Sequence, residues 1–74
     1  MAYCYDKLWE LAYKKHLNKT ALRDKARITN STLARLSKNQ TVSMDALARL
    51  CDCLDCNIED IVEYRKEDDI NELY

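Results

Sequence analysis

The 74-residue chain contains no glycine and no proline. Without glycine, each tight turn must place Asn, Asp or a strained residue where the backbone turns left-handed. The chain also has no apolar run long enough for a membrane span or for the core of a secretory signal. We therefore expect a cytoplasmic protein, in which the four cysteines stay reduced rather than forming a disulfide framework.

Residues suited to catalysis are also scarce. His16 is the only histidine, the lack of glycine excludes a glycine-rich phosphate loop, and we expect no paired buried carboxylates. General acid–base and nucleophilic chemistry need groups of these kinds. The sequence therefore predicts a protein that is not an enzyme and that works without a cofactor.

The residues that are present are typical of a small helical domain. Charged residues make up 34% of the chain, Leu and Ala are frequent, and strand-like alternation is missing over most of the length. This composition predicts an all-α protein. Residues 1–74 form one domain, and a chain of this length buries only about 60–65% of its unfolded surface, so a partner subunit would add useful stability.

Apolar periodicity and capping residues together predict five short helices. The predicted helices span residues 6–16, 19–26, 30–37, 44–54 and 58–62. Their expected N-caps are Asp6, Asn18, Thr29, Ser43 and Asn57.

The segments between and beyond the helices are also informative. Asn39 and Asp55 follow two of the helices, and both residue types tolerate left-handed backbone better than other non-glycine residues. Two segments, from Ala2 to Tyr5 and from Glu63 to Arg65, either pair as a short antiparallel β-ribbon or remain frayed ends.

Charge is strongly segregated along the sequence. Residues 14–39 carry eight Lys or Arg and one Asp, a net charge of +7, whereas residues 40–74 carry three basic and ten acidic residues, a net charge of −7. The basic half suggests a surface for a polyanion, and the acidic half suggests a surface that repels one. Nucleic acid is therefore the expected partner.

The most informative stretch is residues 19–37, where two short helices are separated only by Arg27-Ile28-Thr29. A three-residue turn makes the helices cross steeply, and five apolar residues then close a small core: Leu22, Ala26, Ile28, Leu33 and Leu36. The outer face of the second helix stays free and carries Asn30, Ser31, Ala34, Arg35 and Lys38. A short polar and basic helix of this kind fits the major groove of DNA.

Residues 18–36, NKTALRDKARITNSTLARL, resemble the helix-turn-helix of the lambda-repressor-like (Cro/Xre-type) regulators. The resemblance continues through VSMDALARLC at residues 42–51 to IEDIV at residues 58–62 and covers roughly residues 6–62. It implies a five-helix DNA-binding domain and a transcriptional regulator of bacterial or phage type, acting as a repressor.

Two residues depart from the family's pattern. Arg23 stands where the family usually has Ala, and it can extend outward if the helix is slightly rotated. Arg27 stands where the family usually has Gly in the turn, and a positive φ at this residue would cost on the order of 1 kcal/mol unless the turn is reshaped.

The family's roles, carried over residue by residue, imply a DNA-binding site. The base-reading positions are Asn30, Ser31 and Arg35, of which Arg35 is the best candidate for a bidentate contact to guanine. The phosphate-binding positions are Asn18, Lys19, Thr32, Lys38 and Asn39. The alternative for Lys19 and Lys38 is ordinary solvated surface, and the alternative for Arg35 is a surface ion pair.

The cysteines Cys51, Cys53 and Cys56 form a C-x-C-x-x-C pattern that a soft metal could use. Cys51 and Cys53 point about 200° apart on an intact helix, so they cannot share a metal there. The resemblance implies that all three are small core residues, because the family has Ala, Ala and Val at these positions. We expect core packing and no metal site, with a metal or redox role as the alternative.

Five of the six aromatic residues lie near a terminus in sequence: Tyr3, Tyr5, Trp9, Tyr64 and Tyr74. Tyr5 and Trp9 can complete the core against the last helix, or the terminal aromatics can form the seam of a homodimer. We expect a homodimer, because one chain of this size makes few base contacts and two reading helices lie about 34 Å apart.

Two other functions stay open beside the regulator. One is an antitoxin that binds its operator and also binds a toxin through the acidic tail, residues 63–74. The other is a protein-interaction module that has kept the fold and lost DNA binding. DNA affinity that falls steeply with salt would favour the regulator over the interaction module.

Overall fold

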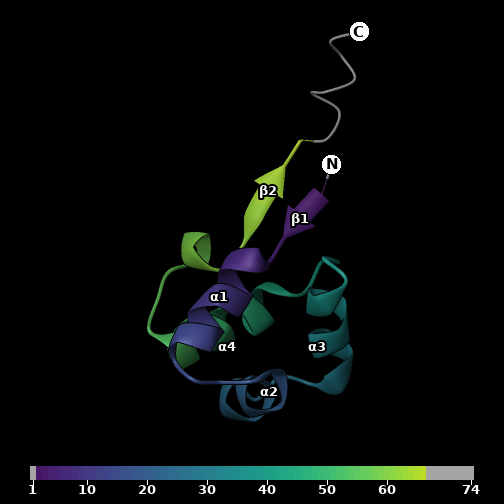
Figure 1. The fold of residues 1–74 in the computed structure, drawn as a ribbon. Coiled ribbons are helices and arrows are strands. Elements are labelled where there is room, and N and C mark those ends of the chain that lie inside the picture. Colours follow the sequence, from purple (N-terminus) through teal and green to yellow (C-terminus); the bar gives the residue numbers. More distant parts are fainter. Residues whose placement is uncertain (1, 67–74) are drawn as a thin grey trace, which may run out of the picture.

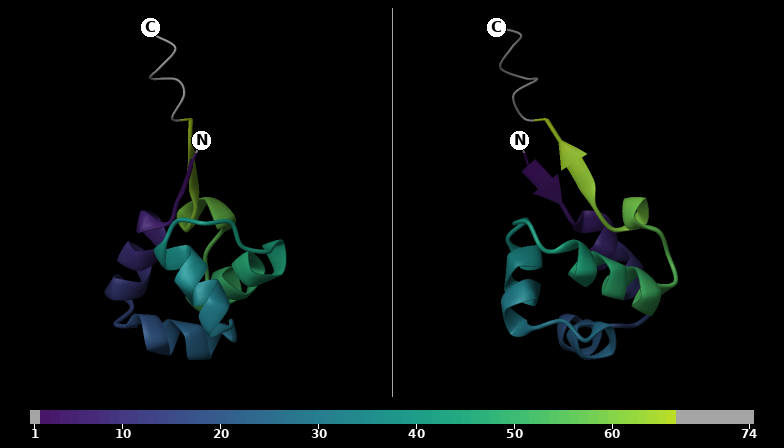
Figure 2. Two further views of the ribbon diagram at one scale, coloured as in Figure 1. Left: turned by 90° about the vertical axis from the view of Figure 1, so that its right-hand side faces the viewer. Right: turned by 180° about the vertical axis from the view of Figure 1, so that it is seen from behind.

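The structure, a computed structural model, describes residues 2–66. Within that part, four α-helices, one short 3-10 helix and two strands follow one another: β1 (Ala2–Cys4), α1 (Asp6–Lys14), α2 (Lys19–Ala26), α3 (Asn30–Ser37), α4 (Met44–Leu54), η1 (Ile58–Asp60) and β2 (Glu63–Arg65). The β1–β2 ribbon projects from the helices on the side opposite α2 (Figures 1 and 2). Across residues 2–66, no helix has the length and apolarity that crossing a membrane requires.

The starts of α2, α3 and α4 are fixed by the capping residues that the sequence predicts. In each case the side chain of the N-cap accepts a hydrogen bond from the backbone N–H three residues later, which satisfies a donor that the helix itself cannot pair. The three bonds are Asn18 to Ala21 at 2.8 Å, Thr29 to Thr32 at 3.1 Å, and Ser43 to Ala46 at 3.1 Å. The bounds of these three helices match the predicted ones.

The first helix differs from its prediction at both ends. Tyr5, not Asp6, holds the N-cap position, and no side chain caps the helix there. The helix ends at Lys14 rather than at residue 16, because His16 takes a left-handed conformation with φ of 62°. This turn lets the Leu17 N–H donate to the Ala12 carbonyl at 2.9 Å, which closes the helix end.

The predicted fifth helix, residues 58–62, is not confirmed. Only Ile58–Asp60 is helical, as a single 3-10 turn, and its start is held by the Asp60 carboxylate, which accepts from the Asn57 N–H at 3.0 Å. Glu63 already pairs with β1, so too few residues separate the cap from the strand for an α-helix to form. The domain therefore has four α-helices within residues 2–66 rather than five.

The terminal β-ribbon is confirmed, with its first strand ending at Cys4 rather than at Tyr5. β1 and β2 pair antiparallel, with Ala2 opposite Arg65, Tyr3 opposite Tyr64 and Cys4 opposite Glu63. The rings of Tyr3 and Tyr64 lie on one face with their centroids 5.6 Å apart. This cross-strand aromatic pair stabilises an otherwise very short sheet. Of the predicted acidic tail, residues 67–74 lie outside the described part.

The core draws on all four α-helices. Its buried members are Tyr5, Leu8, Ala12, Leu22, Ala26, Ile28, Leu36, Ala46, Leu47, Leu50, Leu54 and Ile61. Tyr5 is 2% exposed, and its hydroxyl donates to the Gln40 carbonyl at 2.8 Å, so the polar end of this buried ring is satisfied. Burial, and secondly the neighbouring Tyr3, raise the pKa of Tyr5. Trp9 and Leu33, both expected in the core, are partly buried against it.

Candidate nucleic-acid interface

The turn between α2 and α3 is built without the glycine that such a turn favours. Arg27 adopts left-handed backbone with φ of 60° and ψ of 44°, and the N–H groups of Arg27 and Ile28 both donate to the Arg23 carbonyl. Ile28 then enters the core and Thr29 caps α3. Of the two alternatives at this position, a positive φ or a reshaped turn, the structure has the positive φ at Arg27, where the chain passes from α2 to α3 (Figure 2).

Arg49 supports this turn from α4, a contact that sequence reasoning missed. Its guanidinium donates to the Arg27 carbonyl at 2.9 Å. Arg27 directly follows α2 as its C-cap, and backbone carbonyls at the end of a helix lack helical partners. The one available signal was Arg49's position as a lone cation within the acidic stretch from residue 40 to residue 63.

The three predicted base-reading residues all lie exposed on α3. Asn30 and Ser31 stand in its first turn, and Arg35 follows one turn later than Ser31, so helical spacing places Ser31 and Arg35 on the same face. Lys38 lies just beyond the C-terminus of the helix and is also exposed. The buried Leu36 holds the opposite side of α3 against the core, which leaves the polar face outward.

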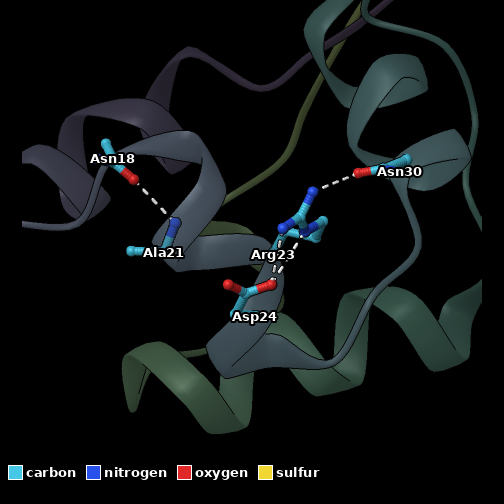
Figure 3. A network of polar contacts seen from close by, with 5 residues as sticks. All are labelled: Asn18, Ala21, Arg23, Asp24 and Asn30. Atoms are coloured by element: carbon cyan, nitrogen blue, oxygen red, sulfur yellow. Dashed lines mark hydrogen bonds and ion pairs between the residues drawn. The ribbon is translucent and has the colours of Figure 1, made fainter.

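Asn30 is held by Arg23, as Figure 3 shows. One terminal nitrogen of the Arg23 guanidinium donates to Asn30 Oδ1, while Nε donates to Asp24 Oδ1 at 3.0 Å and the other terminal nitrogen lies 2.9 Å from the same oxygen as an ion pair. The Arg23 side chain is 29% exposed and lies toward α3, rather than extending outward from α2 as the sequence suggested. It thus links the two helices across their turn.

Two of the predicted phosphate-binding residues lie at the start of α2 and already have partners. Asn18 Oδ1 accepts from the Ala21 N–H. The Lys19 Nζ lies 4.6 Å from the centre of the Trp9 ring and donates to Ser37 Oγ at 3.2 Å. The Trp9 ring on α1 and the Ser37 hydroxyl on α3 thus hold the ammonium group of Lys19, which is in α2. Lys19 nevertheless remains exposed to solvent.

The other predicted phosphate-binding residues lie at the two ends of α3. Thr32 is half-buried, and its hydroxyl accepts from that of Thr29 at 3.1 Å. Asn39 follows the helix with φ of 57° and accepts on Oδ1 from the Tyr5 N–H at 3.1 Å. The left-handed conformations expected at Asn39 and at Asp55, where φ is 54°, are both confirmed.

The basic block of residues 14–39 lies wholly within the described part, and it covers the end of α1, all of α2 and all of α3. Six of the ten acidic residues that follow are described, on α4, in the loop after it, on η1 and on β2. α2 and α3 therefore both lie in the basic part of the sequence, and a net positive charge of this kind attracts phosphates.

The cysteines pack against the core, as predicted. Cys51, Cys53 and Cys56 are half-buried, and Cys4 on β1 is buried. Burial raises the pKa of the Cys51 thiol, and burial together with the adjoining Cys51 and Asp60 raises that of Cys56 to about 11. Within residues 2–66, no group of three or more His, Cys, Asp or Glu side chains lies close enough to bind a metal.

Comparison with known proteins gives two matches. The family model described as the Cro/C1-type HTH (helix-turn-helix) DNA-binding domain matches residues 7–67. The crystal structure of the transcriptional regulator VanUg (Form II) is similar in fold, with a TM-score of 0.80 and 37% sequence identity over 84% of this chain and 83% of that chain. Among curated proteins, none matches the sequence.

Proposed function

Because this chain belongs to the Cro/C1-type helix-turn-helix DNA-binding family, we propose that it is a sequence-specific transcriptional regulator that reads the major groove with α3. The observation that carries the proposal is the exposed polar face of α3 inside the basic block of residues 14–39. The positive field would bring the domain to any duplex, and the side chains of α3 would then select the sequence.

The side chains that would contact the edges of the bases are those of Asn30, Ser31 and Arg35. Arg35 would bond guanine O6 and N7, a contact worth about 1–3 kcal/mol of discrimination against the wrong base. Asn30 and Ser31, at the exposed start of α3, would reach neighbouring base edges.

Phosphate contacts would flank these base contacts. Asn18 and Lys19 lie at the start of α2, where backbone N–H groups add further donors. Thr32, Lys38 and Asn39 would bind the backbone on either side of α3. The bonds from Lys19 to Ser37 and from Tyr5 to Asn39 support this role, because they hold two of the five side chains in place before DNA arrives.

The regulator would act as a homodimer and as a repressor. A single α3 reads only a few base pairs, whereas two copies about 34 Å apart would read two half-sites one turn apart. Tyr64, 48% exposed on the ribbon with its ring tilted against that of Tyr3, is suited to the interface between copies. Sedimentation of the protein alone would show two chains per particle, and Tyr64→Lys would reduce them to one.

Selection of bound duplexes from a random pool tests the proposal. We expect a short palindromic site, bound with an affinity that falls steeply as salt rises, with a slope of about −0.9 for each phosphate neutralised. A transcription assay with that site inside a promoter would then show lower transcript levels. No DNA binding even at low salt would overturn the proposal and favour a protein-interaction role.

A further inference from the structure

The contact between Arg23 and Asn30 fixes which way the Asn30 amide faces. A guanidinium carries only hydrogen-bond donors, so the Asn30 atom that it contacts must be the carbonyl oxygen. The amide NH₂ group of Asn30 is then directed away from Arg23. Asn30 itself is exposed, so this NH₂ group is the part left to meet a ligand.

The guanidinium is itself held in place. Its Nε donates to Asp24 Oδ1, a second nitrogen forms an ion pair with the same oxygen, and the third is aimed across the turn at α3 (Figure 3). Asp24 is 65% exposed on its side chain, and an ion pair so open to solvent stabilises the fold little. Its effect is to orient Arg23, because an arginine bound through two nitrogens has few ways left to turn.

We propose that Arg23 is a positioning residue that makes Asn30 a hydrogen-bond donor toward DNA. The inference rests on the proposed function. Asparagine recognises adenine with both halves of its amide, accepting from N6 and donating to N7. With Oδ1 engaged by a cation, Asn30 selects a base that presents acceptors alone, which in the major groove means guanine O6 and N7 or thymine O4.

The position of Arg23 makes this role specific to its side chain. It is the fifth residue of α2 and its guanidinium reaches the first residue of α3 over the turn. A small side chain at this place would leave Asn30 Oδ1 free to accept from adenine N6. The identity of a residue that need not touch DNA would therefore set the preference at one base pair.

Selection from a random pool would be run on the wild type, Arg23→Ala, Asn30→Ala and the double variant. Lys25→Ala is the matched control, because it removes one positive charge from the same helix. At one position of each half-site, Arg23→Ala is expected to raise the relative frequency of adenine by roughly 5- to 10-fold, in line with the discrimination of one such contact. Lys25→Ala should lower affinity for all sequences and leave that frequency unchanged. In the Asn30→Ala background, Arg23→Ala should have no further effect on it.

A readout without DNA accompanies the selection. The side-chain NH₂ resonances of Asn30 should shift and become more mobile in Arg23→Ala and stay unchanged in Lys25→Ala, with thermal unfolding confirming that both variants fold. Unchanged base preference in Arg23→Ala, or an equal change in Lys25→Ala, overturns this inference. Neither result affects the proposed function as a transcriptional regulator. If the wild type selects no sequence at all, the proposed function fails and this inference fails with it.

Discussion

The guanidinium of Arg49 on α4 donates a 2.9 Å hydrogen bond to the backbone carbonyl of Arg27, in the turn between α2 and α3. This bond ties the helix-turn-helix to the helix that packs beneath it. It also gives a hydrogen-bond partner to the carbonyl of Arg27, the residue that takes the left-handed conformation in this turn.

We expect Arg49→Met to lower the free energy of unfolding by about 1 kcal/mol, the usual worth of one such bond. In a domain of this size that corresponds to a melting temperature roughly 4–8 °C lower, measured by circular dichroism. Met keeps an unbranched apolar stem but lacks the guanidinium and therefore has no donor. Lys25→Met, an exposed site on α2, is the control and should change the melting temperature little. Equal melting of Arg49→Met and wild type would show that the bond contributes nothing.

We expect Asp55→Gly to stabilise the protein and Asp55→Val to destabilise it. Asp55 ends α4 with φ of 54°, and its N–H donates to the Cys51 carbonyl, so the left-handed conformation is required. Left-handed backbone costs an L-residue about 1–2 kcal/mol, which exceeds the roughly 0.5–1 kcal/mol that glycine loses in chain entropy. Urea unfolding would measure a gain of about 0.5 kcal/mol for Gly and a loss above about 1 kcal/mol for Val. A Gly variant less stable than the wild type would contradict this account of the turn.

We expect the Cys56 thiol to react slowly with iodoacetamide in the folded protein. The thiolate is the reactive form, and its pKa rises from 9.0 to about 11, so near pH 8 the folded thiol should react about 100-fold more slowly than in the urea-unfolded chain. The folded state holds the proton more tightly, so this protection persists below pH 9 and is lost as the pH approaches 11. Mass mapping of the labelled peptides would follow Cys56 by itself. Equal rates in the folded and unfolded chains would contradict its packing.

Arg35→Ala and Lys38→Ala should weaken DNA binding in different ways. Loss of Arg35 should relax the preference at one guanine of each half-site, at a cost of about 1–3 kcal/mol for the selected sequence. Loss of Lys38 should weaken all sequences alike and reduce the slope of the salt dependence by about one. Fluorescence anisotropy on the selected site and on a scrambled duplex separates the two effects. If the selected site is unchanged in Arg35→Ala, the proposed contact to guanine is wrong.

Much of this fold could be predicted from local chemistry. Asn18, Thr29 and Ser43 mark the starts of three helices because a side-chain oxygen three residues before a free N–H is a purely local signal. The turns at Asn39 and Asp55 were predictable for the same reason, since few residue types accept left-handed backbone. At His16 the sequence predicted a continuing helix, and the structure has a left-handed turn there instead.

What the sequence missed depends on contacts between distant residues. The 3-10 turn at Ile58–Asp60 is short because Glu63 pairs with Cys4, a strand contact that no local pattern of residues 57–62 reveals. For the candidate site, the sequence predicted which residues α3 exposes. It could not predict that Arg23 turns toward Asn30 or that Arg49 reaches Arg27, because both contacts depend on how the helices cross.

The pairing of Ala2 with Arg65 has a practical consequence for protein engineering. These two residues are strand partners at the end of the molecule opposite α2, about 5 Å apart between Cα atoms as in any antiparallel pair. A linker of a few residues could therefore join them into a circular backbone. Reopening that circle in the loop between α4 and η1 would give a permuted protein whose new ends lie outside the helix-turn-helix, and whose residues 18–39 remain one uninterrupted segment.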